Sequence, residues 1–133
     1  MPVQLSVFQL PGGARCLRED CAGEVTVEDT RVILQQTEPG GPFHGLPILA
    51  LTEKMTSVTA DARGMIAGRG DVSGKEVWMA VVMTNPVLRV TINFMMRILK
   101  NRKVRLFNRE AEAIQWLDER VREDTARGTP PVT

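Results

Sequence analysis

Residues 75–86 read KEVWMAVVMTNP, and this stretch decides the fold class. β-Branched and aromatic residues dominate its first part, which predicts a strand over 75–83. Asn85 can then cap a helix, and Pro86 suits the first helical position. A strand followed at once by a helix is typical of an α/β protein, in which helices connect and cover the strands of one sheet.

The same alternation continues on both sides of this stretch. The sequence KVRLF at 103–107 predicts another strand, and Asn108 is the expected cap of a last helix. The continuous apolar run LPILALT at 46–52 is typical of a strand buried on both faces. A short helix is expected over 59–67, followed by a glycine-rich loop over 68–74.

The N-terminal part of the chain supplies the remaining elements. In order, we expect a strand at 3–10, a turn at 11–13, a strand at 14–20 that Gly23 ends, a helix at 26–36 and a loop at 38–45. Thr26 can cap this first helix, because its side chain can accept from the free amide groups of the first turn. The predicted order is β-β-α-β-α-β-α-β-α, which is an α/β fold with one mixed sheet of about five strands.

Length and composition limit the classes of function. The 133 residues fit one domain over 1–124, and the polar, proline-rich residues 125–133 are expected to form a disordered tail. A net charge of +1 argues against non-specific nucleic-acid binding, which needs a broad basic surface. No apolar run is long enough to span a bilayer, and the first residues do not resemble a signal peptide, so we expect a cytoplasmic protein.

No motif in the sequence predicts a reaction, a metal or a cofactor. Cys16 and Cys21 are five positions apart, and on one extended strand they would point to opposite faces of a sheet. They are therefore expected to share neither a disulfide nor a metal. His44 lies in a predicted loop, and no serine or cysteine nucleophile motif accompanies it. These observations predict a protein that binds rather than an enzyme.

The stretch VLRVTINFMMRIL at 87–99 is unusually apolar, with nine apolar residues out of thirteen. On a helical wheel its apolar arc spans roughly 240°, which is wider than packing on a sheet requires. One half of the arc holds Val87, Val90, Phe94 and Ile98. The other half holds Leu88, Ile92, Met95, Met96 and Leu99. If one half covers the sheet, the other must meet neighbouring elements, a ligand, a second chain or a membrane surface.

Coverage by flanking helices or a long loop is the default interpretation of this face. Among occupants from outside the chain, a protein partner is preferred, with a second copy of the chain as a compatible one. Paired methionines favour an adaptable apolar contact. The centre of the predicted contact is formed by Leu88, Ile92, Met95, Met96 and Leu99, with Arg89 and Arg97 at its rim. The alternative is a cavity for an apolar small molecule. Membrane contact is disfavoured, because the basic residues that follow are better explained as an exposed charge ladder on a strand.

Three stretches carry a resemblance to a known superfamily: GEVTVED at 23–29, KEVWMAVVMTNP at 75–86 and KVRLFNREAEAIQWL at 103–117. Over about residues 3–123 the chain resembles the STAS superfamily, which includes anti-anti-sigma factors and the cytoplasmic domains of sulfate transporters. It is most similar to bacterial STAS-like proteins that are sometimes grouped with CRAL-TRIO lipid-binding domains. The resemblance implies a STAS-like fold and a regulatory or scaffold role in signalling, or, alternatively, the binding of a lipid or apolar small molecule.

The sequence departs from this superfamily at one position that matters for regulation. Anti-anti-sigma factors carry a phosphorylatable Ser or Thr just after the third strand, within a turn that resembles Asp-Ser-Ser-Gly. Residues 51–64 read LTEKMTSVTADARG and lack that pattern. Ser57 and Thr59 lie nearby, and Ser57 is the candidate phosphosite.

Overall fold

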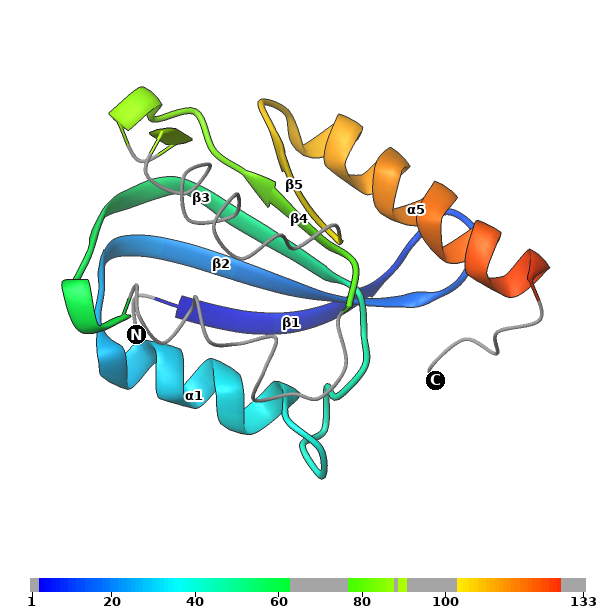
Figure 1. The fold of residues 1–133 in the computed structure, drawn as a ribbon, viewed down its shortest axis with the longest axis horizontal. Coiled ribbons are helices and arrows are strands. Elements are labelled where there is room, and N and C mark those ends of the chain that lie inside the picture. Colours follow the sequence, from blue (N-terminus) through cyan, green and yellow to red (C-terminus); the bar gives the residue numbers. More distant parts are fainter. Residues whose placement is uncertain (1–2, 63–76, 88, 91–102, 128–133) are drawn as a thin grey trace.

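A computed structural model of the chain describes residues 3–62, 77–87, 89–90 and 103–127. One five-stranded sheet, with strand order β1-β2-β3-β4-β5, forms its centre (Figure 1). The strands are β1 (Val3–Gln9), β2 (Arg15–Val25), β3 (Ile48–Val58), β4 (Met79–Val82) and β5 (Val104–Phe107). β1 and β2 are antiparallel, and each later strand pairs parallel to its neighbour. The prediction of a mixed α/β sheet is confirmed.

Two long helices, α1 (Val27–Thr37) and α5 (Glu110–Ala126), cover the two faces of the sheet. Adjacent residues of β3 show this, because side chains alternate between the faces of a strand. Leu49 packs in one buried cluster with Leu117 of α5. Ala50 packs in another with Ile33 of α1. The residues of β3 from Ile48 to Ala50 are at most 3% exposed, as expected for a strand buried on both faces.

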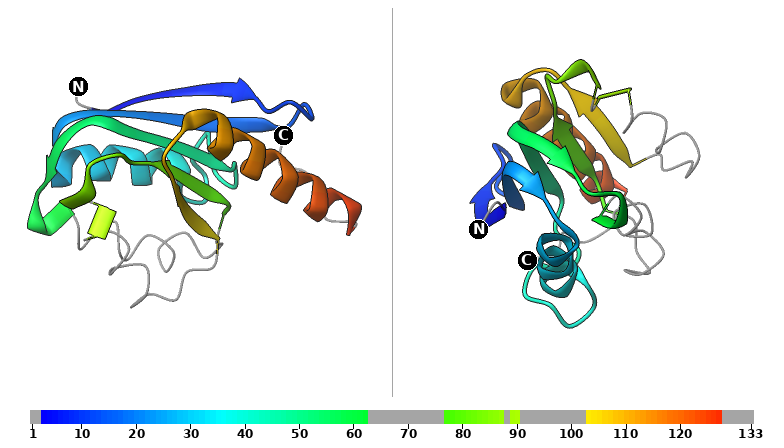
Figure 2. Two further views of the ribbon diagram at one scale, coloured as in Figure 1. Left: turned by 90° about the horizontal axis from the view of Figure 1, so that it is seen from above. Right: turned by 90° about the vertical axis from the view of Figure 1, so that its left-hand side faces the viewer.

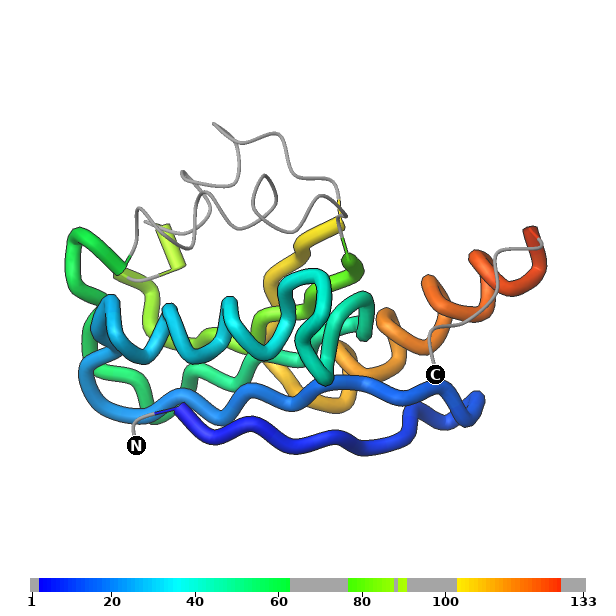
Figure 3. The backbone as a smooth tube through the Cα atoms, turned by 90° about the horizontal axis from the view of Figure 1, so that it is seen from below, coloured from blue at the N-terminus to red at the C-terminus, as the bar shows by residue number. Residues whose placement is uncertain are grey.

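The second strand of the β1–β2 hairpin, traced in Figure 3, is longer than the sequence predicts. The expectation that Gly23 ends the second strand is wrong, because β2 continues to Val25. Gly23 has a φ of +65°, which glycine adopts without steric cost. The pairing of β2 with β3 shifts register on both sides of this region, between Asp20 and Ala22 and between Gly23 and Glu24. The glycine therefore allows a bulged strand to bend and continue.

β3 and β4 also differ in length from the expected strands. β3 runs to Val58 rather than ending at Thr52, because β2 keeps pairing with it as far as Val25. β4 is limited to Met79–Val82, and Trp78 precedes it. Residues 75–76, the start of the expected strand, lie outside the described residues.

The helix starts confirm two of the three predicted caps, those at Thr26 and Asn85. Thr26 forms a capping box with Asp29 at the start of α1. Thr59 and Asn85 precede helical residues at 60–62 and 86–90, with Leu88 not described. The third predicted cap, Asn108, is wrong, because α5 begins after Arg109 with no side-chain cap.

The last helix ends later than predicted. α5 extends to Ala126, two residues past the expected end of the domain at 124. The rest of the predicted tail, from 128 onward, lies outside the described residues.

Candidate partner-binding site

The parallel strands end at a common edge of the sheet, which we call the carboxyl edge. Asp20, Leu51, Val82 and Phe107 lie side by side there on β2 to β5. β4 and β5 end at this level, whereas β2 and β3 continue together to Val25 and Val58. A helical segment follows each of the four strands at this edge. The carboxyl ends of parallel strands are where open α/β sheets usually bind ligands.

The extended part of the carboxyl edge carries hydroxyl groups near two helix starts. The backbone N–H of Thr59 donates to the carbonyl of Val25 at 3.1 Å, which fixes the start of segment 60–62 beside the end of β2. The Thr59 hydroxyl accepts from the N–H of Ala62 and donates to the carboxylate of Asp61. This last hydrogen bond is the main cause of a lowered pKa of Asp61.

Ser57, the candidate phosphosite, lies within β3 rather than in a turn after it. It faces Glu24 of β2 in the register of the two strands, and its Oγ donates to Glu24 Oε1 at 3.5 Å. The residue that begins the next helical segment is Thr59. The role of Ser57 as a phosphosite stays a prediction.

The shorter part of the carboxyl edge, beyond β4 and β5, is held together by Arg89. Its guanidinium donates to the carbonyl of Met83 at 3.1 Å and to Oδ1 of Asn108 at 2.8 Å. Oδ1 of Asn85 accepts from the N–H of Val87 at 3.0 Å. Arg89 therefore ties the start of the predicted partner-binding helix to the ends of two strands. The Asn108 amide accepts from Arg89, which accounts for the absence of the predicted cap on α5.

Two valines lie at the start of the predicted partner-binding helix. Within the described ranges, they are the large hydrophobic residues whose side chains are exposed. Val87 is 74% exposed and Val90 is 69% exposed. We call these two residues the valine patch. They belong to the half of the apolar arc that the sequence analysis did not choose for the partner. The helical wheel contained this signal, but it could not tell which half packs on the sheet.

The residues predicted to contact a partner lie mostly outside the described part of the chain. Arg89 is described and is half-buried, with the contacts given above. The others, which lie outside the described residues, are Leu88, Ile92, Met95, Met96, Arg97 and Leu99. Their part in binding stays a prediction.

The cysteines and the histidine lie away from the valine patch. Cys16 packs in the α5-side cluster and Cys21 against the α1-side cluster, which confirms that they face opposite ways. Nδ1 of His44 lies 3.0 Å from the carbonyl of Thr37, at the end of α1. Within the described ranges no three His, Cys, Asp or Glu residues form a set that could hold a metal ion.

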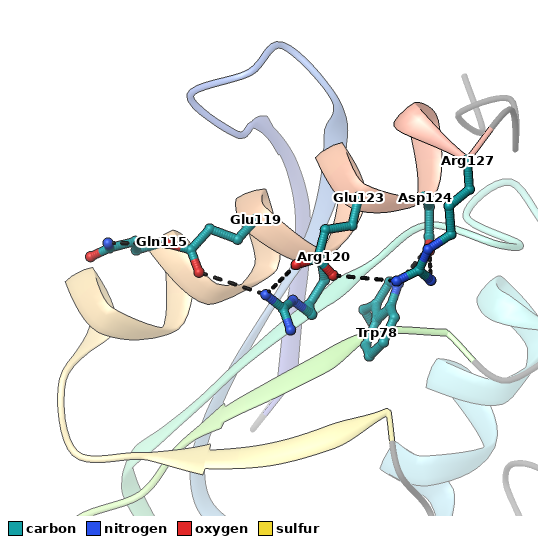
Figure 4. Close-up of polar contacts among 7 residues, drawn as sticks. All are labelled: Trp78, Gln115, Glu119, Arg120, Glu123, Asp124 and Arg127. Carbon is teal, nitrogen blue, oxygen red and sulfur yellow. Dashed lines mark hydrogen bonds and ion pairs between the residues drawn. The ribbon is translucent and has the colours of Figure 1, made fainter.

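The two tryptophans meet on the α5 side of the sheet, and Figure 4 shows Trp78 beside Asp124 of α5. Trp78 and Trp116 are edge to face, with ring centroids 5.7 Å apart. Nε1 of Trp78 donates to Asp124 Oδ2 at 2.7 Å, and Arg120 forms an ion pair of 2.7 Å with Glu123. Both tryptophans are half-buried against the core. This cluster fastens α5 to the sheet and has a structural role.

Among the helices in the described part of the chain, none has the length and apolar character that a membrane span requires.

Comparison with solved structures defines the class of fold. The chain is similar to a protein of the DUF3478 family with a SpoIIAA-like fold from Shewanella loihica, with a TM-score of 0.60 and 13% identity over 86% of this chain and 93% of that one. It is also similar to the anti-sigma factor antagonist SpoIIAA in its unphosphorylated form, with a TM-score of 0.53 and 16% identity over 90% and 98% of the two chains. The STAS-like fold that the sequence resemblance implies is thus confirmed.

The family follows from the sequence itself. Residues 24–121 match the family described as Domain of unknown function (DUF7793), and the chain belongs to that family. No curated protein matches the chain.

Proposed function

We propose that this protein is a non-enzymatic regulatory or scaffold protein that binds another protein at its carboxyl edge. The observation that carries the proposal is the valine patch. Two adjacent large apolar side chains, Val87 and Val90, stand mostly in solvent at the edge where α/β sheets bind ligands. Exposed apolar side chains that gather on one surface mark interaction sites more often than isolated ones do.

The setting of the valine patch supports a docking role. Arg89 lies between the two valines in sequence and holds the helix start to Met83 and Asn108, so the valines are presented on a fixed backbone. A fixed apolar surface binds with a smaller loss of conformational entropy than a mobile one. The sequence of 91–99 extends this apolar character, and we include Ile92, Met95, Met96, Arg97 and Leu99 in the proposed contact on that basis.

A photo-cross-linking amino acid placed at Val90 of the full chain, in cells of its source organism, tests the proposal. A cross-linked protein would be identified by mass spectrometry, purified, and titrated against the unmodified chain and two variants. Val90→Asp should weaken binding at least about tenfold, because a carboxylate would be desolvated at the centre of the contact. Since Val90 is exposed, this change should leave the unfolding temperature nearly unchanged.

Gln35→Asp provides the matched control. Gln35 is exposed near the end of α1, at the opposite edge of the sheet from the valine patch. This variant should bind the partner as the unmodified chain does. Equal affinities of the Val90→Asp and Gln35→Asp chains would exclude the valine patch as the contact. A lipid-sized mass retained by the purified protein in native mass spectrometry would instead support the small-molecule alternative.

A further inference from the structure

A second interaction surface lies at the outer edge of the sheet, on β1. β1 is the first strand in the sheet order and pairs only with β2 among the described residues. Figure 2 shows β1 as the outermost strand, with no other described element beyond it. We call its outer side, over Val3–Gln9, the β1 edge. This edge is distant from the valine patch in the sheet order, because β2 and β3 separate β1 from β4.

The register of the hairpin identifies the backbone groups on the β1 edge. The N–H of Leu10 donates to the carbonyl of Ala14, so these opposed residues form a hydrogen-bonded pair. Bonded and non-bonded pairs alternate along an antiparallel ladder. Gln4, Ser6 and Phe8 therefore bond to β2. The N–H and C=O groups that point outward are those of Val3, Leu5, Val7 and Gln9.

A contact on the far side of β2 agrees with this assignment. The N–H of Leu17 donates to the carbonyl of Pro47, so the backbone of Leu17 points away from β1 and toward β3. Leu17 lies opposite Val7 in the β1–β2 register. In a non-bonded pair, each residue directs its N–H and C=O groups away from the other strand. The N–H and C=O of Val7 therefore point away from β2, toward the outer edge of the sheet.

The β1 edge lacks the features that usually protect an edge strand. Its sequence VQLSVFQ contains no charge, proline or glycine. Its register with β2 is unbroken over seven residue pairs, so no bulge twists it away. At the other edge of the sheet, β5 is four residues long and carries exposed Arg105. Lysine, arginine, proline, bulges and short length are the devices that keep edge strands from pairing with other chains.

The side chains of β1 leave apolar surface for a neighbour to cover. Leu5 and Val7 are half-buried on the α1 side, and Phe8 is half-buried on the α5 side. An added strand would place side chains about 5 Å from each of them. The edge therefore combines unpaired backbone groups with partly covered apolar side chains.

We propose that a second copy of this chain pairs with the β1 edge, antiparallel and across a two-fold axis at Ser6. In this register Leu5 of one copy faces Val7 of the other, and Val3 faces Gln9. Every outward N–H and C=O is then used, giving about eight hydrogen bonds across the interface. The strand is self-complementary in this arrangement. Because it carries no charge, no like charges meet across the axis.

Sedimentation equilibrium of the full chain over a wide range of concentrations tests this proposal. The unmodified chain should show a reversible monomer–dimer equilibrium. Ser6→Lys and Ser6→Asp each place two like charges opposite one another at the axis. Each should therefore raise the dimer dissociation constant by at least about fivefold. Mixing the two variants should restore the dimer as a heterodimer, because opposite charges then meet. Gln35→Lys, an exposed change far from β1, should dimerise normally.

Hydrogen exchange provides a readout that does not depend on the variants. The amides of Val3, Leu5, Val7 and Gln9 should exchange slowly in concentrated solution and quickly after dilution, whereas those of Gln4, Ser6 and Phe8 should stay protected in both. Circular dichroism would confirm that the variants fold.

Three results would overturn the proposal. The first is a chain that stays monomeric at every concentration, which would leave the edge to an extended segment of another protein. The second is a dimer that survives both Ser6 changes, which would place the interface elsewhere, for example at the valine patch. The third is a mixture of the two variants that does not associate, which would exclude the Ser6 register.

Discussion

The backbone N–H of Gly12 donates a hydrogen bond of 2.8 Å to Oδ1 of Asp118, joining the β1–β2 turn to α5 across 106 residues of sequence. Asp118 is 8% exposed, and its second oxygen accepts from Nε of Arg122 at 2.8 Å. A Cβ at position 12 would lie 2.9 Å from Asp118 Oδ1, so a side chain there would displace the carboxylate that accepts from this amide. This contact fixes the hairpin turn against the last helix.

Replacing Asp118 should therefore destabilise the whole domain. In Asp118→Ala the Gly12 amide loses its acceptor, and the free energy of unfolding should fall by about 1–3 kcal/mol. Urea unfolding followed by tryptophan fluorescence measures the change. Glu119→Ala, on the exposed side of the same helix, should change stability by less than about 0.5 kcal/mol. Equal effects of the two substitutions would show that the Gly12 contact contributes nothing specific.

Contacts of this kind explain which parts of the fold the sequence could predict. The cap of α1 was predictable, because Thr26 and Asp29 are three residues apart and their bonds are local. The predicted cap at Asn108 failed because Arg89, from a distant part of the chain, donates to its side chain. The true extent of β3 likewise depends on pairing with β2, which the sequence of β3 alone does not contain.

The candidate site was predictable only in part. The cap at Asn85 is a local feature and could be predicted from residue spacing, whereas most of the predicted apolar arc at 87–99 lies outside the described residues. The exposure of Val87 and Val90 depends on how the helix start is held against the sheet by Arg89, which is a tertiary contact. The β1 edge went unnoticed because an edge strand is defined by the order of strands in the sheet, and sequence order does not give that order.

Trp78 and Asp124 should show a measurable energetic coupling. The hydrogen bond between Nε1 of Trp78 and Oδ2 of Asp124 links the start of β4 to the last turns of α5. We expect Trp78→Phe and Asp124→Ala each to destabilise the protein, and their double-mutant cycle to give a coupling energy of about 1 kcal/mol. Chemical denaturation of the four proteins provides the cycle.

Asp124→Asn is the matched control for this cycle. It keeps an oxygen acceptor for Trp78 and should cost less than Asp124→Ala. Additive effects in the cycle would mean that the two groups contribute independently, and that ring packing against Trp116 alone holds this end of α5.

A negative charge at position 57 should loosen the end of the β2–β3 ribbon. Ser57 faces Glu24 directly across the two strands. Ser57→Asp would place two carboxylates opposite one another and should destabilise the protein by up to about 1 kcal/mol, whereas Ser57→Lys should not. Thermal unfolding at low ionic strength shows the difference, and added salt should reduce it.

The same variants test the phosphosite prediction once a partner is known. Partner binding that is lost in Ser57→Asp and kept in Ser57→Ala would support control by phosphorylation. Unchanged binding in both would end that hypothesis, whatever their stability.

The pH dependence of stability should reveal the burial of Cys16. Burial raises the pKa of this thiol from its ordinary value of 9.0 to about 12. Between these two values the unfolded chain loses the thiol proton while the folded chain keeps it. The Cys16 contribution to the free energy of unfolding should therefore fall as pH rises above about 9, by up to about 1.4 kcal/mol per pH unit.

Urea unfolding of the unmodified chain and of Cys16→Val, from about pH 8 to 10.5, isolates this effect, since other groups titrate alike in both. The stability difference between the two proteins should shift in favour of Cys16→Val as pH rises. Parallel stability curves for the unmodified chain and Cys16→Val would contradict the assignment.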